Sequence, residues 1–163
     1  MAEALQVGMA ELKVLKGPGK LAAHGIGSCV VLALWDPETG LGGLAHSMLP
    51  TASAQPDFEE TPAKYCDTAV GALLASLAEQ GAKSASCRAW LVGGANMFAA
   101  LPREVPPLPL GERNLLSARE SLRSWNVALL AEDCGGDRGR SMELDCSDGS
   151  VRVWSAWTAP RRL

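Results

Sequence analysis

The sequence predicts one α+β domain over residues 1–163, in the broad α/β class, with a mixed β-sheet sandwich core and helices packed on its outside. Three observations favour this fold class. Strand-like runs gather near both ends of the chain, two segments with helical spacing lie between strands, and turn-forming residues separate the runs. A chain of this length buries roughly 70% of the surface exposed by its unfolded form, so it needs no metal or disulfide to fold.

The first part of the chain is predicted to form strands. Residues 6–15 alternate in part between apolar and polar side chains, and residues 20–24 follow as a second short strand. The run VVLALWD at 30–36 is apolar and β-branched, which is typical of a buried strand. Pro37-Glu38-Thr39-Gly40 then predicts a turn, because proline presets its first corner and glycine accepts a positive φ at its last. The apolar stretch 41–49 returns from this turn.

The remainder is predicted to place two helices between strands. Thr61 followed by Pro62 is a helix start, and apolar residues recur every four positions from there until Gly81. A second helix is expected to stop at Asn126. The other predicted elements are loops at 51–60, 102–111 and 135–140, strands at 88–92 and 127–132, that second helix at 112–125, and a hairpin of 141–146 with 151–157.

The composition argues against several classes of function. The net charge is −3 and the Lys and Arg residues are scattered, so nucleic acid is not expected as a partner. The N-terminus has neither a signal-peptide pattern nor a long apolar run, so we expect a cytoplasmic protein without membrane insertion. Five irregularly spaced cysteines and two histidines favour neither a disulfide framework nor a metal site, and no cofactor is expected.

The turn predicted after residue 36 brings a cysteine and a histidine together. If Asp36 and Leu41 form the first pair beside the turn, residue numbers paired across the two strands have a constant sum, and His46 lies opposite Val31. Cys29 is two residues from Val31 and points to the same face. Cys29 and His46 are then diagonal neighbours, at roughly 7–8 Å between their Cα atoms.

This arrangement suits acyl transfer by a thiol. A free cysteine is mostly protonated near neutral pH, and an imidazole within reach can take its proton, return it to a leaving amine and then activate water. Gly27 and Ser28 let the backbone bend closely, so N–H groups near 28–29 are expected to face a developing oxyanion. The alternative is a core cysteine beside a histidine that bonds a backbone carbonyl, and a bulge at Gly42-Gly43 would turn His46 to the other face.

Three further groups have open interpretations. Gly93 and Gly94 predict either a wall of the active-site cleft or a tight turn without a ligand. Arg113 and Asn114 either contact substrate or join elements of the fold. Asp133 and Asp137 flank a glycine loop, and we expect them to make turn hydrogen bonds rather than to bind a metal.

Ordered motifs along nearly the whole chain resemble those of the CheD family of chemoreceptor glutamine deamidases. GIGSCVVLALWDP and GGLAHSMLP are similar to the family's nucleophile and histidine motifs. The other motifs that carry the resemblance are YCDTA at 65–69, VGGANM at 92–97, LGERN at 110–114, AEDCGGDRGR at 131–140 and VRVW at 151–154.

The resemblance implies an enzyme that converts selected receptor glutamines to glutamate through a cysteine thioester, releasing ammonia, with Cys29 as nucleophile and His46 as general base. It also implies a CheC-type phosphatase as partner, and a fold shared with the cytotoxic necrotizing factor toxins. The alternatives are a regulatory binding module with little catalysis and a receptor methylesterase.

One position departs from the family pattern. The family commonly has a threonine six residues before the nucleophile, whose oxygen orients the histidine, and this chain has Ala23 there. A methyl group cannot accept the imidazole N–H, so either another oxygen orients His46 or activity is reduced. His24 is adjacent, but an exposed or packed strand residue is the favoured interpretation there.

Overall fold

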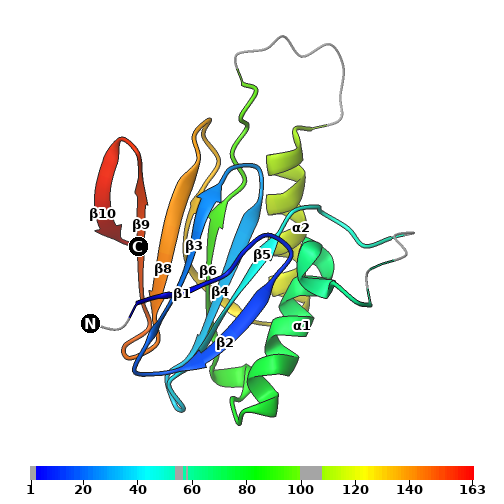
Figure 1. The fold of residues 1–163 in the computed structure, drawn as a ribbon. Coiled ribbons are helices and arrows are strands. Elements are labelled where there is room, and N and C mark those ends of the chain that lie inside the picture. The colour runs from blue at the N-terminus through cyan, green and yellow to red at the C-terminus, as the bar shows by residue number, and fades with distance from the viewer. Residues whose placement is uncertain (1–2, 54–56, 58, 100–107) are drawn as a thin grey trace.

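A computed structural model describes residues 3–53, 57, 59–99 and 108–163 of the protein. Two five-stranded sheets pack face to face, and two helices cover the outer face of one of them (Figure 1). This confirms a mixed α+β architecture with its helices outside. The elements in chain order are β1 (Leu5–Gln6), β2 (Leu12–Lys16), β3 (Lys20–Ile26), β4 (Val30–Asp36), β5 (Leu41–Ser47), η1 (Pro62–Lys64), α1 (Cys66–Glu79), η2 (Ser84–Ser86), β6 (Arg88–Gly93), α2 (Leu110–Ser124), β7 (Ala128–Cys134), β8 (Arg140–Asp145), β9 (Ser150–Ser155) and β10 (Thr158–Arg162).

Both sheets are mixed. The first sheet has the strand order β1-β3-β8-β9-β10, and only its β1–β3 pair is parallel. The second sheet has the order β2-β5-β4-β6-β7, and only its β6–β7 pair is parallel. The second sheet is the middle layer, with the first sheet on one side and α1 and α2 on the other (Figure 1).

Strand β4 lies at the centre of this middle layer and is buried on both faces. Val31 and Ala33 point into the cluster between the two sheets, whereas Leu32 and Leu34 point into the cluster beneath the helices. Each face of β4 therefore meets an apolar layer. This explains why its sequence is a continuous apolar run rather than an alternating one.

The single strand predicted over residues 6–15 is wrong. The chain forms β1 in the first sheet and β2 in the second, and residues 7–11, here called the N-terminal crossover, connect them. The Val7 N–H donates to the Ala22 carbonyl of the first sheet, and the Ala10 N–H donates to the His46 carbonyl of the second. Ala10 has a φ of 65°, a conformation in which a non-glycine residue interrupts a strand.

The first helix begins later than predicted. Pro62 opens a short 3₁₀ turn, and Tyr65 then adopts an extended conformation, so α1 starts at Cys66. Tyr65 forms a parallel β-bridge with Leu49, which keeps its backbone out of the helix, and its fully buried side chain donates its hydroxyl to Asp57. The end of α1 before Gly81 and the stop of α2 at Asn126, which has a φ of 55°, are confirmed.

The closing hairpin is confirmed, and a further strand follows it. Strands β8 and β9 pair around Asp148-Gly149, and β10, which the sequence did not predict, pairs with β9 at the edge of the first sheet. Leu108 and Pro109 precede a helix that starts at residue 110, two residues earlier than predicted. Most of the loop predicted at 102–111, and residues 54–56 and 58 of the loop predicted at 51–60, lie outside the described residues.

Candidate active site

The β4–β5 hairpin pairs in the predicted register. Asp36 lies opposite Leu41, Val31 lies opposite His46, and the ladder is continuous between these pairs. Cys29 directly precedes β4 and packs against the same inter-sheet cluster as Val31. Cys29 and His46 therefore share the face of the second sheet that looks toward the first sheet, as diagonal neighbours across the strand pair.

His46 is held by the N-terminal crossover. Its side chain is buried, with 2% of the residue's surface exposed, and its Nδ1 lies 3.2 Å from the carbonyl oxygen of Val7. A carbonyl only accepts hydrogen bonds, so Nδ1 carries the proton and Nε2 is the basic nitrogen. In the described part of the chain, Nε2 has no hydrogen-bond partner. A backbone oxygen thus orients His46, whereas Ala23 is a fully buried residue of β3.

The loop that carries Cys29 is fastened to the end of β6. The Gly94 N–H donates to the Cys29 carbonyl at 2.8 Å, and the Ala95 N–H donates to the Gly27 carbonyl at 2.9 Å. At Gly93, which has a φ of 120°, a Cβ would lie 2.2 Å from the Cys29 oxygen, so only glycine permits this approach. Gly93 and Gly94 are both buried, and they support the main chain of the loop that carries Cys29.

The resting pair is expected to be uncharged. Burial raises the pKa of the half-buried Cys29 thiol, with its own backbone amide acting weakly in the other direction. Burial also lowers the pKa of His46 below its usual 6.5, against smaller opposing effects from the Val7 carbonyl and the Glu11 charge. A neutral imidazole can accept a proton from a neutral thiol, which is the starting state for general-base activation.

The cysteine loop presents backbone donors. Among the described residues, the amide N–H groups of Ser28 and Cys29 donate to no other residue, and that of Cys29 acts on its own sulfur. An oxyanion that forms beside the sulfur can therefore accept hydrogen bonds from these N–H groups without displacing a protein acceptor.

Asn114 was left open by the sequence and lies at this site. It is fully buried in α2, and its Nδ2 donates to the Ser28 carbonyl at 2.8 Å and to the Met48 carbonyl at 3.1 Å. Its polar side chain shares the buried helix face of Leu115, Ala118 and Leu122, which is the one sequence signal that marks it. Arg113, in contrast, is exposed and donates to the Leu108 carbonyl.

His24 lies away from the site. It is exposed on β3, its Nδ1 lies 3.1 Å from the Ser141 hydroxyl, and its ring meets the Trp154 ring edge-on at 5.7 Å. Its neighbour Ala23 faces the inter-sheet cluster, so His24 points to the opposite face of the first sheet.

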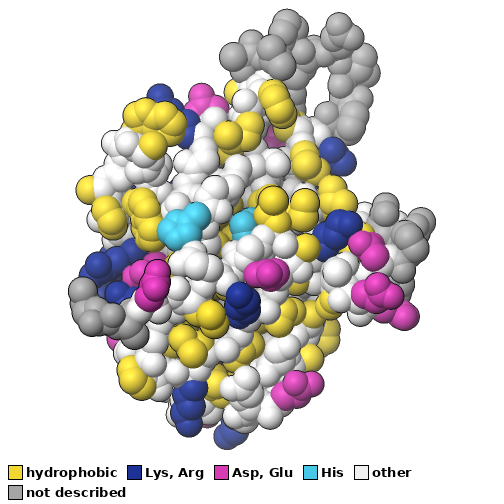
Figure 2. Space-filling view, viewed as in Figure 1, with side chains coloured by type: hydrophobic (Ala, Val, Ile, Leu, Met, Phe, Trp, Pro, Cys, Tyr) yellow, Lys and Arg dark blue, Asp and Glu magenta, His cyan; other side chains and the backbone are white. Residues whose placement is uncertain are grey.

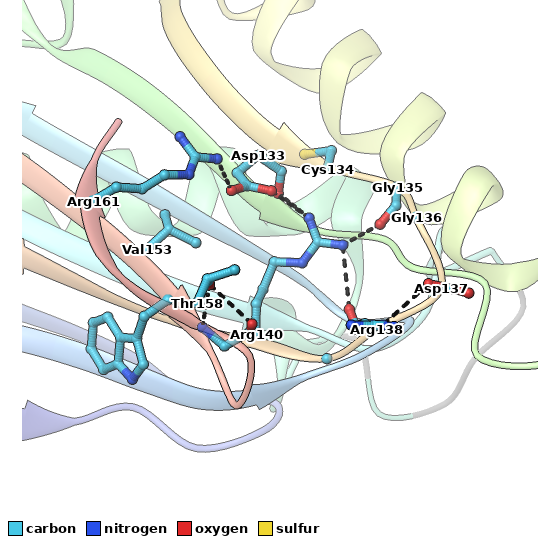
Figure 3. A pocket seen from close by; sticks show the side chains of 13 residues that line it. Asp133, Cys134, Gly135, Gly136, Asp137, Arg138, Arg140, Val153, Thr158 and Arg161 are labelled. Carbon is cyan, nitrogen blue, oxygen red and sulfur yellow. Dashed lines mark hydrogen bonds and ion pairs between the residues drawn. The ribbon is translucent and has the colours of Figure 1, made fainter.

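A cavity of about 350 Å³ lies beside Asp133 rather than over Cys29. Figure 3 shows Arg140 reaching between Asp133 and the Gly135 carbonyl, with Arg161 of β10 on the other side of Asp133. Among the described residues, the Asp137 carboxylate has one ion-pair contact, with Arg138 at 3.9 Å. These charges are paired with one another. On the face shown in Figure 2, basic side chains are likewise interspersed with acidic ones.

Fold and site together define a two-sheet α+β protein with a thiol directly before one strand and an imidazole on the neighbouring strand. Comparison with known proteins gives this class a family. A family profile described as CheD chemotactic sensory transduction matches residues 48–155. The chain belongs to the CheD family. The match begins after both Cys29 and His46, so it is independent of the two candidate catalytic residues.

Whole-chain relatives agree with this assignment. A probable chemoreceptor glutamine deamidase CheD of Desulfitobacterium hafniense is 39% identical over 153 residues, covering 94% of each chain. The corresponding protein of Moorella thermoacetica is 41% identical over 91% of this chain and 89% of its own. The chemoreceptor glutamine deamidase CheD of Thermotoga maritima is 38% identical over 90% of this chain and 88% of its own. No helix among the described residues is long and apolar enough to cross a membrane.

Proposed function

We propose that this protein deamidates glutamine side chains of chemotaxis receptors, with Cys29 as nucleophile and His46 as general base. The names of its relatives support the reaction and the substrate. One observation supports the residues. The β4–β5 register puts Cys29 and His46 on one face. The Val7 carbonyl binds Nδ1, and Nε2 has no partner among the residues that the structure describes.

The first half-reaction forms a thioester. Nε2 of His46 takes the Cys29 proton, and the sulfur attacks the side-chain carbonyl carbon of the receptor glutamine. The carbonyl oxygen becomes an oxyanion facing the N–H groups of Ser28 and Cys29. As the C–N bond breaks, the imidazolium returns the proton to the leaving nitrogen, and ammonia departs.

The second half-reaction consumes water. His46 removes a proton from a water molecule, whose oxygen attacks the thioester carbonyl. The C–S bond then breaks, the sulfur recovers its proton from His46, and the receptor side chain leaves as glutamate. The unpaired Nε2 of the resting state suits both steps, because hydrogen bonds at catalytic sites commonly tighten only when substrate is bound.

The test compares ammonia release from a purified cognate chemoreceptor by the wild-type protein and by Cys29→Ala. We expect release by the wild type only, together with a mass increase at defined receptor glutamines. Equal rates would end the enzyme proposal and leave a regulatory binding module. Methanol release from a methylated receptor, without ammonia release from an amidated one, would instead indicate a methylesterase.

We also propose the remaining implications of the family resemblance. The chain would act as one domain over residues 1–163 in the cytoplasm, with a fold related to the cytotoxic necrotizing factor toxins and without a cofactor. A CheC-type phosphatase would be its partner. Co-elution of the two purified proteins in gel filtration is the expected result, and separate elution at micromolar concentrations would count against the partnership.

A further inference from the structure

We infer that Asn114 is a positioning residue that aims the oxyanion-binding N–H of Cys29. This inference rests on the proposed function. The Asn114 side chain comes from α2, 86 residues along the chain from Ser28, and is fully buried. Its Nδ2 donates to two carbonyls, one of which directly precedes the nucleophile while the other follows His46 by two residues.

The orientation of this amide follows from its acceptors. Both groups that face it are carbonyl oxygens, so the nitrogen must point toward them, because the Asn114 oxygen would be repelled there. The remaining atom, Oδ1, is buried and has no hydrogen-bond partner among the described residues. A buried acceptor without a donor costs free energy. The two hydrogen bonds of Nδ2 are therefore made at the cost of leaving Oδ1 unsatisfied.

The contact with Ser28 controls the peptide plane that carries the Cys29 amide. In a trans peptide the C=O and N–H groups point in opposite directions. When Asn114 draws the Ser28 carbonyl toward α2, the Cys29 N–H must point away from the helix layer. The Cys29 side chain lies on that same side, packed against the inter-sheet cluster, and its own amide is close enough to lower the pKa of the thiol slightly.

A second hydrogen bond fixes the main chain on the other side of Cys29. The Cys29 carbonyl at the other end of the residue is held by the Gly94 N–H at 2.8 Å. The peptide groups on both sides of Cys29 are thus tied, one to α2 and one to the end of β6. Removal of the Asn114 donor would free the first of them and let the Cys29 N–H turn away from the oxyanion.

The experiment separates this role from general support of the fold. Asn114→Ala removes the donor, and Asn114→Leu removes it while filling a similar volume. Ammonia release from the cognate chemoreceptor and alkylation of Cys29 by iodoacetamide are measured on the full-length proteins across a range of pH. Alkylation needs the sulfur but forms no oxyanion, so it reports nucleophile and base without the N–H donor.

We expect kcat for ammonia release to fall on the order of 10²-fold in both variants, the effect of losing one oxyanion donor. KM and the pH profile of alkylation should stay near wild type. Ser117→Ala is the matched control, because Ser117 lies on the same helix and donates to the Pro50 carbonyl without touching the cysteine loop. It should retain wild-type kcat.

Two outcomes would overturn the inference while leaving the proposed function intact. One is a kcat within about threefold of wild type in both Asn114 variants. The other is an equal loss of deamidation and alkylation, which would show that Asn114 only supports the fold. A wild type that releases no more ammonia than Cys29→Ala would remove the proposed function itself, and the inference with it.

Discussion

His46 is oriented by the main chain rather than by another side chain. In a catalytic triad a carboxylate usually fixes the tautomer of the histidine and stabilises its charged form. Here the neutral carbonyl of Val7 fixes the tautomer, and burial works against the charged form. The structure therefore predicts a base that is well placed and rather weak, which suits an intrinsically nucleophilic thiol.

The lowered pKa of His46 has a consequence for the pH dependence of deamidation. Protonated imidazole cannot accept the Cys29 proton, so kcat/KM should fall only as the pH drops through a folded-state pKa that lies below the ordinary 6.5. Folding stability should follow the same direction. The unfolded chain binds a proton near pH 6.5 and the folded chain resists it, so stability is lost as the pH falls below that value.

A pH series of initial ammonia-release rates would check this. His24→Ala is the natural control, because the chain contains only two histidines and His24 is exposed on the far face of the first sheet. It should leave the acid limb unchanged. An acid limb at or above pH 6.5 in the wild type would contradict the buried, uncharged state assigned to His46.

At the scale of elements, the end of β6 supports the cysteine loop through two glycines. Gly94 has a φ of 68°, and a Cβ there would lie 2.3 Å from Leu115 of α2. Gly135 has a similar φ of 80°, but nothing lies within 4 Å of its Cβ position. Alanine substitutions at Gly94 and at Gly135 therefore separate the cost of the backbone conformation from the cost of the close contact.

We expect Gly135→Ala to lower the free energy of unfolding by about 1 kcal/mol, the cost of a left-handed conformation for a residue with a Cβ. Gly94→Ala should lower it by about 2–4 kcal/mol, because overpacking against α2 is added. It should also lower kcat, because the backbone shift that relieves the contact with Leu115 would displace the Gly94 N–H that holds the Cys29 carbonyl. Urea unfolding with unchanged slope measures the stability, and equal losses in the two variants would refute the contact argument.

The elements also show what sequence patterns can and cannot predict. The register of β4 and β5 was predictable because a four-residue turn with Pro37 and Gly40 favours one pairing, which places His46 on the face of Cys29. The alternative, a bulge at Gly42-Gly43, does not occur. Local patterns do not encode the break at Ala10, where no glycine marks the positive φ. Nor do they encode the Asn114 contact, which joins residues far apart in the chain.

At the scale of the whole molecule, the N-terminal crossover links the two sheets at the active site. The Val7 N–H donates to β3, and the Val7 carbonyl binds the imidazole of His46 on β5. The Glu11 carbonyl accepts the His46 backbone N–H at 3.0 Å. Figure 1 shows the first strands of the chain lying across both sheets. The relative placement of the two layers therefore affects the geometry of the base.

Deletion of residues 2–9 tests this dependence, because it joins Met1 to Ala10 and leaves no carbonyl in the place of Val7. The variant loses the Val7 carbonyl, and we expect kcat to fall between about 10- and 100-fold. This loss is at or below the lower end of the ~10²–10⁴ that a positioned base contributes, because His46 itself remains. Deletion of residues 2–4 alone keeps β1 and Val7 and is the matched control, with kcat near wild type. Circular dichroism would confirm that both fold. Wild-type kcat in the longer deletion would show that His46 does not need this acceptor.

The main-chain origin of the Val7 contact affects how such a site can be found. Alanine scanning trims side chains and leaves every carbonyl in place, so it would pass over the group that orients the base. Comparison of relatives would pass over it too, since any amino acid at position 7 supplies the same oxygen. The Val7 carbonyl can orient the imidazole although Ala23 offers no side-chain oxygen.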